Sequence, residues 1–472
     1  MHSTSQDLRR DALDIWQAGV DAVRGDQLVR DNVRVEGKWL QIADETIDLE
    51  LVRHIVVVGA GKAGAGMAAG LEEALGAELL AAKQVTGWVN VPADCLRELG
   101  RIHLHAARPA GVNEPTAAGV EGTRQILKLA ASLSNDDLCI CLISGGGSAL
   151  MPAPAPGIKL SDKQAVTTCL SAAGANIEQL NIVRKQLSAV KGGGLARACG
   201  AARLVSLVIS DVLGDPLDLI ASGPTADDTS TPQAALKVLQ QVAGKDNAIS
   251  GSIFEFLRNK QDKCATSPME KIEASVANVI LGNNAVAVDA AGLRAEQLGY
   301  RHAMVAANKL EGEAEVVGRH HAKLALEMQR GDGPNCLVTG GEPVVQLIAK
   351  GQRGRGGRSQ QLVLAALDEL VEHLQVEFTS TAELSQAAGD LVILSGGTDG
   401  EDGPTDAAGA VLDGEIILQT IERGLDTGDF LRRNDAYHFF DPLNALIRSG
   451  PTHTNVCDLR VVLVRQASNR PG

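Results

Sequence analysis

Four short glycine-rich segments, each directly after an apolar run, hold the residues of this sequence most able to do chemistry. One of them follows the run Leu138–Ile143 and contains Ser144, Gly145, Gly146, Gly147 and Ser148. Bare backbone N–H groups in a glycine turn, joined by serine hydroxyls, can hold an anion such as a phosphate. Similar segments follow the runs 55–58, 336–338 and 391–394. We therefore interpret the four segments as loops that hold a polyphosphate and a small acid.

Cations accompany these loops although the chain as a whole is acidic. Lys62 lies within the segment Gly59–Gly64, where it could face a phosphoryl group or a carboxylate. Residues 351–361 combine glycines with arginines at the start of a predicted helix, whose dipole also favours anions. The three arginines there are Arg353, Arg355 and Arg358. Their guanidinium groups match phosphate and carboxylate oxygens in pairs, although a solvated surface loop is the alternative.

Polar residues of the first half add to this set. Asn181 lies in a predicted helix over residues 177–190, and Lys191 follows it just before three glycines. Lys191 could be a phosphate ligand or simply a cation at a helix end.

Carboxylates also follow several of the predicted strands. They are Asp211, Glu342, Asp399 and Asp402. Carboxylates at strand ends can hold Mg²⁺ that bridges phosphate oxygens, and one could accept a proton from an attacking hydroxyl. The alternative for each is a turn-capping role.

The sequence does not match three better-known motifs. Gly59–Gly64 is similar to the dinucleotide pattern GxGxxG, but no acidic residue ends a second strand to bind a ribose. The segment also lacks the GxxxxGK[ST] pattern of a P-loop. Gly146–Leu150 is not the GxSxG elbow of a serine hydrolase.

The loops need a scaffold, and the sequence predicts an α/β one. Short apolar runs near 55–58, 87–91, 102–106 and 138–143 alternate with helical stretches at 116–133 and 161–173, which indicates a parallel sheet. The second half repeats the alternation, and residues 229–270 are more polar, so we place a domain change there.

Composition excludes several classes of function. The 472 residues are 44% hydrophobic and carry a net charge of −14, with only 2% aromatics. Nucleic acid and anionic membranes are therefore unexpected partners. The eight cysteines show no CxxC or zinc spacing, and no signal sequence or membrane-length apolar run is present. We expect a cytoplasmic protein with buried free thiols.

Ordered motifs along nearly the whole chain, from about residue 8 to 465, resemble the glycerate 2-kinase family of the MOFRL type. The resemblance is carried by residues 143–150, 181–185, 187–193, 209–215, 221–225, 340–343, 356–358 and 397–410. It implies ATP-dependent phosphorylation of D-glycerate, usually at the 2-hydroxyl, with Mg²⁺. It also implies a Rossmann-like, DUF4147-type domain over 1–268 and a second α/β domain over 269–472, with a MOFRL core near 335–465. The active site would lie in the cleft between the domains.

The residues and the resemblance together give a set of expected site residues. The expected catalytic residues are Lys62, Arg358 and Asp211, of which the resemblance assigns the lysine and the arginine. Substrate or phosphate would contact Ser144, Gly145, Gly146, Gly147, Ser148, Asn181, Lys191, Gly397 and Thr398. Glu342 and Asp399 would bind Mg²⁺.

The sequence departs from the family pattern at a few positions. Ser359 and Gln361 replace the asparagine and glutamate of GGRNQE, and His453 and Cys457 replace residues of GPTGTNVND. We expect these changes to affect the choice of substrate more than the type of reaction. Alternative functions are an NAD(P)H-dependent hydroxypyruvate reductase and a non-catalytic nucleotide or sugar-acid sensor. A homodimer is a further expectation.

Overall fold

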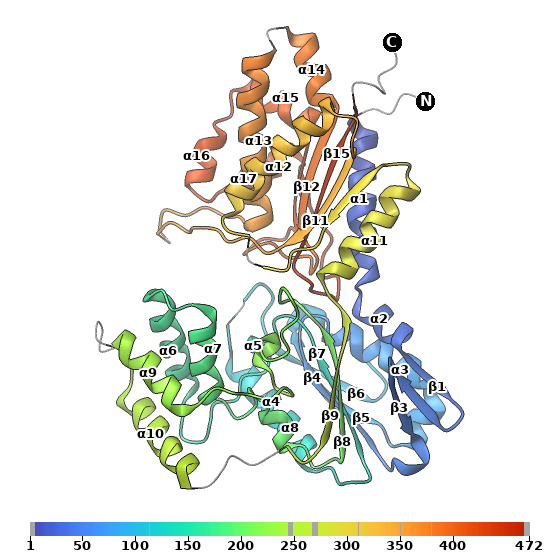
Figure 1. Ribbon diagram of the computed structural model, residues 1–472, viewed down its shortest axis with the longest axis vertical. Coiled ribbons are helices and arrows are strands. Elements are labelled where there is room, and N and C mark those ends of the chain that lie inside the picture. Colours follow the sequence, from blue (N-terminus) through green and yellow to red (C-terminus); the bar gives the residue numbers. More distant parts are fainter. Residues whose placement is uncertain are drawn as a thin grey trace. The chain divides into compact units, whose positions relative to one another are not determined.

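A computed structural model describes residues 5–112, 114–243, 249–266, 272–309, 311–349, 351–378 and 380–466 (Figure 1). The chain forms two compact units. The first unit is Gly25–Leu281, and the second unit combines Met1–Arg24 with Gly282–Gly472. The expected domain boundary between residues 268 and 269 lies outside the described residues. The units differ from the expected domains because the N-terminal helix packs with the second half of the chain.

The first unit is built on a six-stranded sheet in the order β6-β5-β4-β7-β8-β9. All the pairs from β6 to β8 are parallel. Numbered from its own first strand, this order is 3-2-1-4-5-6, the order of dinucleotide-binding α/β folds. The predicted Rossmann-like parallel sheet is thus confirmed. Its strands are β4 (Ile55–Ala60), β5 (Thr86–Pro92), β6 (Ile102–Arg108), β7 (Leu138–Ile143), β8 (Arg203–Ile209) and β9 (Ser275–Gly282).

The strands of this sheet read as continuous apolar runs because helices cover the sheet. Every residue of β4 and β7 is buried, as expected for a parallel sheet between helical layers. The helices are α2 (Gly25–Asn32), α3 (Gly64–Ala82), α4 (Ala117–Ala131), α5 (Gly147–Leu150), α6 (Leu160–Ala172), α7 (Ile177–Gln186), α8 (Gly194–Ala198), α9 (Pro232–Ala243) and α10 (Gly251–Thr266).

Two smaller substructures complete the first unit. The expected hairpin near residues 33–42 is present and gains a third antiparallel strand. Its strands are β1 (Val33–Glu36), β2 (Trp39–Ile42) and β3 (Glu45–Asp48). Helices α6, α7, α9 and α10 share an apolar core of their own, with Leu170, Val183, Leu239 and Ile253 at its centre (Figure 1). This core fixes the helices that carry several polar site residues.

The second unit is also α/β, but its six-stranded sheet is mostly antiparallel. The order is β10-β11-β15-β12-β13-β14, and only β10 and β11 are parallel. The alternating apolar runs predicted strands here but not their direction, because direction depends on which strands become neighbours. The strands are β10 (His302–Val305), β11 (Cys336–Gly341), β12 (Leu391–Gly397), β13 (Gly409–Asp413), β14 (Leu446–Ile447) and β15 (Asp458–Val464).

Helices cover both faces of this sheet (Figure 1). Alternate strand residues enter two cores: Ile393 and Val462 face one, while Leu394 and Val461 face the other. The helices are α1 (Ser5–Ala22), α11 (Asn284–Gln297), α12 (Ala314–Arg330), α13 (Arg358–Glu377), α14 (Thr381–Gly389), α15 (Gly414–Arg423), α16 (Thr427–Arg432) and α17 (Ala436–Phe440). Helix α1 packs with α11 on the second of these cores.

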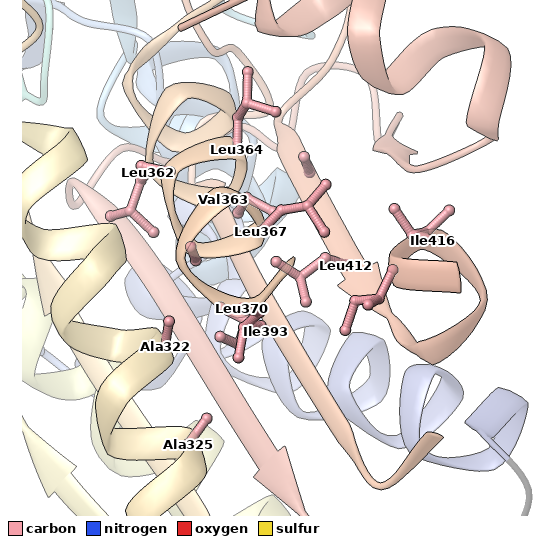
Figure 2. Packing of buried hydrophobic residues seen from close by; sticks show 14 of the residues in the cluster. Ala322, Ala325, Leu362, Val363, Leu364, Leu367, Leu370, Ile393, Leu412 and Ile416 are labelled. Atoms are coloured by element: carbon pink, nitrogen blue, oxygen red, sulfur yellow. The ribbon is translucent and has the colours of Figure 1, made fainter. Parts of the chain in front are cut away.

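Helix α13 is the most deeply buried helix segment in the larger core. Figure 2 shows Leu364, Leu367 and Leu370 packed with Ile393 of β12 and Leu412 of β13. The burial of this helix holds its first residue, Arg358, in place.

We expect Leu367→Ala to lower the free energy of unfolding by about 2–5 kcal/mol, because it leaves a cavity in a core that cannot fully collapse. Leu367 is 0% exposed, whereas Val376 on the same helix is 82% exposed. Val376→Ala is therefore the matched control, with an expected change within about 0.5 kcal/mol. Urea denaturation of both variants measures the difference, and equal stabilities would contradict the packing described here.

Candidate functional site

The loops after β4 and β7 meet where the strand order of the first unit reverses. Open α/β sheets bind ligands at this position. Lys62 N donates to Gly145 O at 2.9 Å, and Ala63 N donates to Ser144 Oγ at 3.0 Å. A Cβ on Gly61 would lie 1.9 Å from Ser144 Oγ, so the contact needs a glycine. Two of the four predicted glycine loops are therefore one structural feature.

Charged side chains surround the triple-glycine turn. A Cβ on Gly146, whose φ is +76°, would lie 3.4 Å from Lys62 Cγ and 3.7 Å from an Nη of Arg108. Gly146 N donates to Asp211 Oδ2 at 3.3 Å. The structure thus brings Lys62, Asp211 and the glycines of the turn together. Arg108 is an addition, and its place at the end of β6 was the signal that could have identified it.

A second cluster of polar groups lies beside this turn, around a buried lysine. Lys191 Nζ donates to Ser148 Oγ at 2.6 Å and to Ser222 Oγ at 3.2 Å. The two hydroxyls are 2.9 Å apart, and Ser222 also donates to Asn181 Oδ1 at 3.3 Å. Burial, with repulsion from Arg184, lowers the pKa of Lys191 well below its usual range. Ser148, Asn181 and Lys191 are thus brought together.

Ser222 connects this cluster and was not predicted as a site residue. Ala221 and Ser222 have φ of +51° and +63°, a conformation that costs non-glycine residues about 1–3 kcal/mol. Backbone strain of this kind gathers at functional sites. The strained backbone holds the Ser222 hydroxyl against Lys191. The sequence signal for this loop was its place, at residues 221–225, among the motifs of the resemblance.

In the second unit, the other two glycine loops flank the first residue of β15. Gly341, at the end of β11, and Gly397, at the end of β12, both pair with Asp458. The two strands run the same way because each is antiparallel to β15 between them. The loops therefore reach the same edge of the sheet despite its mixed topology.

Arg358 lies at this edge between two carboxylates. Its Nε and Nη2 bond the two oxygens of Asp458 at 2.8 and 3.0 Å, and its Nη1 lies 2.5 Å from Glu342 Oε1. The side chain of Asp458 is 2% exposed, whereas that of Glu342 is 39% exposed. Burial opposes the charge on Arg358, but Asp458 and Glu342 hold its pKa well above the usual value. Sequence reasoning missed Asp458 because it begins a strand instead of following one.

The helix that begins at Arg358 is capped by a distant carboxylate. The two oxygens of Asp402 accept from Ser359 N at 3.0 Å and Gln360 N at 2.8 Å. A Cβ on Gly357 would lie 2.1 Å from Asp402 Oδ1, so this close contact requires a glycine at position 357. Burial, with repulsion from Asp458, raises the pKa of Asp402 to about 7. Asp402 therefore positions the start of the helix.

The loop after β12 is held tightly to the chain before β15. Thr398 is 0% exposed, and its Oγ1 donates to Cys457 O at 2.7 Å and accepts from Val456 N at 2.9 Å. Asp399 Oδ1 accepts from Glu401 N at 3.0 Å. The Thr398 side chain thus joins two loops, which differs from the expected direct contact with a ligand.

The residues that depart from the family pattern do not lie in one place. Ser359 and Gln361 are buried within the second unit, where Gln361 donates to Glu315 Oε1 at 3.0 Å. The glutamate of the family pattern at position 361 would place a second carboxylate against that of Glu315. His453 and Cys457 have φ of +58° and +70°, in the left-handed region. The family glycine at position 453 suits that conformation.

The other two arginines of the basic loop differ from Arg358. Arg355 lies over the ring of Tyr437, 4.5 Å from its centre, and donates to Pro404 O at 3.1 Å. Asp435 Oδ1 accepts from Arg355 N at 2.9 Å. No polar contact of the Arg353 side chain is found within the described ranges. Arg358 is thus the arginine of this loop that bonds the carboxylates of Glu342 and Asp458.

The described residues contain no cluster of three or more His, Cys, Asp or Glu side chains arranged for a metal. Magnesium commonly binds through one or two carboxylates and completes its shell with water and phosphate oxygens. Asp211, beside the triple-glycine turn, fits that mode, as does Asp399. Glu342 is engaged by Arg358. No helix in the described ranges is both long and apolar enough to cross a bilayer.

Comparison with known proteins agrees with this architecture. The family model described as a domain of unknown function (DUF4147) matches residues 11–258, and the MOFRL family model matches residues 335–458. The chain is 36% identical to a glycerate kinase of Danio rerio, over 95% of this chain and 96% of that one. It is 33% identical to a D-glycerate 2-kinase of Thermotoga maritima, over 97% and 99% of the two chains. The crystal structure of a glycerate kinase from Thermotoga maritima superposes with a TM-score of 0.76 and 32% identity, over 97% of this chain and 100% of that chain.

The raised pKa of Asp402 predicts a pH-dependent stability. Between its usual value of 3.8 and about 7, the folded state holds a proton that the unfolded state has lost. The contribution of this group to the free energy of unfolding therefore falls as pH rises through that range. We expect Asp402→Asn, which cannot titrate, to gain stability relative to the unmodified protein over the same range.

Urea denaturation at about pH 4.5 and about pH 7 measures this difference. Asp332→Asn, at an exposed position of the same unit, is the control and should differ from the unmodified protein equally at both pH values. A pH-independent difference for Asp402→Asn would show that Asp402 keeps an ordinary pKa.

Proposed function

Because this chain belongs to the glycerate kinase family, we propose that it transfers the terminal phosphoryl group of ATP to the 2-hydroxyl of D-glycerate. The observation that carries the proposal is the pair of joined loops after β4 and β7, with Lys62 over the triple-glycine turn. Phosphoryl transfer needs positioned donors and cations more than covalent chemistry by the protein, and this arrangement supplies both.

In this proposal the first unit binds phosphate through its turn. The backbone N–H group of Gly145 would donate to a phosphate oxygen, since Gly146 N already donates to Asp211 and Gly147 N to Ser144 O. The Lys62 ammonium would neutralise the phosphate charge. Asp211 Oδ2 orders the turn through Gly146 N. Asp211 would also hold Mg²⁺, which would supply positive charge to neutralise the phosphates during transfer.

Arg358 would stabilise the charge of the transferred group or of the substrate carboxylate. Its guanidinium has five N–H donors, and the carboxylates of Asp458 and Glu342 receive three hydrogen bonds from it. Two donors therefore remain for an anion. The buried Asp458 fixes the plane of the guanidinium, whereas the half-exposed Glu342 can give way to a ligand.

The remaining expectations follow the same reasoning. We propose that Thr398 and Gly397 shape the second unit's loop instead of contacting the ligand through a side chain, since Thr398 is fully buried. Asp399 stays the second proposed Mg²⁺ ligand. A cytoplasmic location and a homodimer stay predictions.

A reductase is the second candidate because the strand order of the first unit is that of dinucleotide-binding folds. Against it, β5 ends at Pro92 without the acidic residue that binds a ribose. A sensor that binds ATP without turnover is the third candidate.

We expect the unmodified protein to release ADP with D-glycerate, ATP and Mg²⁺, and not to oxidise NADH with hydroxypyruvate. Lys62→Ala and Arg358→Ala should each lower kcat by about 10²–10³-fold, because each removes a preorganised charge. Lys128→Ala, at an exposed position of α4, is the control for Lys62→Ala and should keep normal turnover. Near-normal turnover of both site variants while folded would reject the site.

The position of transfer is tested by phosphorus NMR of the product. A phosphate on the 2-hydroxyl couples to one carbon-bound proton and gives a doublet, whereas a phosphate on the 3-hydroxyl couples to two and gives a triplet. We expect the doublet. A triplet would keep the kinase and reject the proposed position.

A further inference from the structure

Three cations of the first unit lie outside the proposed phosphate turn. Lys163 is on α6, Arg184 is on α7, and Lys191 is in the loop that follows α7. Burial is the largest cause of the lowered pKa of Lys191, and repulsion from Arg184, Lys163 and Lys185 adds to it. Since the apolar core shared by α6 and α7 fixes both helices, the three charges are held within electrostatic reach of one another.

Lys163 is a cation whose ammonium group is buried. Its Nζ is buried and has no hydrogen-bond partner in the part of the chain that the structure describes. Burial, together with repulsion from Arg184, lowers the pKa of Lys163 to about 7. A buried ammonium without a partner opposes folding, so its presence here needs a reason other than stability.

Arg184, on α7, is a half-buried cation. Within the described ranges its side chain makes no ion pair or hydrogen bond, and burial lowers its pKa. The next residue behaves differently, because Lys185 Nζ pairs with Asp218 at 3.1 Å and Asp228 at 3.4 Å. Lys185 thus engages the carboxylates of Asp218 and Asp228, whereas Arg184 has no such partner among the described residues.

Lys191 connects these cations to hydroxyl donors. Its Nζ lies 2.6 Å from Ser148 Oγ, and Ser148 is half-buried at the end of the triple-glycine turn. Ser222 adds a second hydroxyl. Cations and hydroxyls in this combination match the oxygens of a carboxylate or a phosphoryl group.

We propose that Lys163, Arg184 and Lys191, with the hydroxyls of Ser148 and Ser222, form a subsite for a small oxyanion, and we call it the cation subsite. The inference rests on the proposed function, which supplies two oxyanions: the carboxylate of the hydroxy acid and the phosphates of the nucleotide. Anion binding compensates the buried charges that the protein itself leaves uncompensated.

Calorimetric binding of D-glycerate and, separately, of ADP to the full-length protein distinguishes the two sources. The variants are Lys163→Met and Arg184→Gln, with Lys237→Gln, at an exposed position of the neighbouring helix α9, as the matched control. We expect each site variant to weaken the binding of one ligand by about 10–100-fold, the loss for a charge-assisted hydrogen bond. The control should bind both ligands normally.

Stability provides a second readout that a purely structural lysine would not give. Lys163→Met removes a buried, unpartnered charge, so the variant should unfold at a higher urea concentration while it binds the anion more weakly. A variant that unfolds at a lower urea concentration and binds both ligands normally overturns the cation subsite.

Each outcome has one meaning. Weaker D-glycerate binding with normal ADP binding assigns the subsite to the substrate carboxylate, and the reverse pattern assigns it to the nucleotide phosphates. Normal binding of both ligands by both variants rejects the subsite, even if the unmodified protein phosphorylates glycerate. Conversely, weakened binding in a protein that transfers no phosphate keeps the subsite and rejects the proposed function.

Discussion

A cation that is taken out of water requires negative charge nearby, and this requirement organises both halves of the candidate site. Arg358 meets it within the protein, because the buried Asp458 and the half-exposed Glu342 face its guanidinium. Lys185 also satisfies this requirement, because it forms ion pairs with Asp218 and Asp228. Lys163 does not, since its Nζ is buried without a partner among the described residues. Where the protein leaves such a charge uncompensated, a ligand is the remaining source of compensation.

The two units reach a similar arrangement by different routes. In the first unit, parallel β4 and β7 bring two glycine loops together at the point where the strand order reverses. In the second unit, β11 and β12 run the same way only because β15 lies antiparallel between them. In both units glycine is required where one backbone closely approaches another group, as at Gly61 and Gly357. The glycine loops are thus common to two topologies, and the chemistry follows from the loops.

Much of the positioning is done by residues that would not touch a ligand themselves. Asp402 caps the helix that begins at Arg358, and Thr398 joins the loop after β12 to the chain before β15. Asp435 holds the basic loop through Arg355 N. A substitution at such a position would act through the geometry of another residue, so the family motifs contain more than the groups that contact substrate.

The sequence by itself determined the α/β class, the buried strands and the glycine loops that follow them, because apolar runs and glycines are local signals. It also identified Lys62, Asp211, Ser148, Asn181 and Lys191 as site candidates, and the structure brings them together in the first unit in two adjoining clusters.

Only the tertiary structure decided the strand directions of the second unit, the packing of α1 with the second half of the chain, and the roles of Asp458 and Ser222. Each of these depends on which distant segments become neighbours: Asp458 bonds a residue 100 positions away, and the Ser222 hydroxyl is placed by a strained backbone. Charge compensation is likewise a property of the folded chain. The sequence shows that Lys163 is a cation, but not that its Nζ is buried without a hydrogen-bond partner among the described residues.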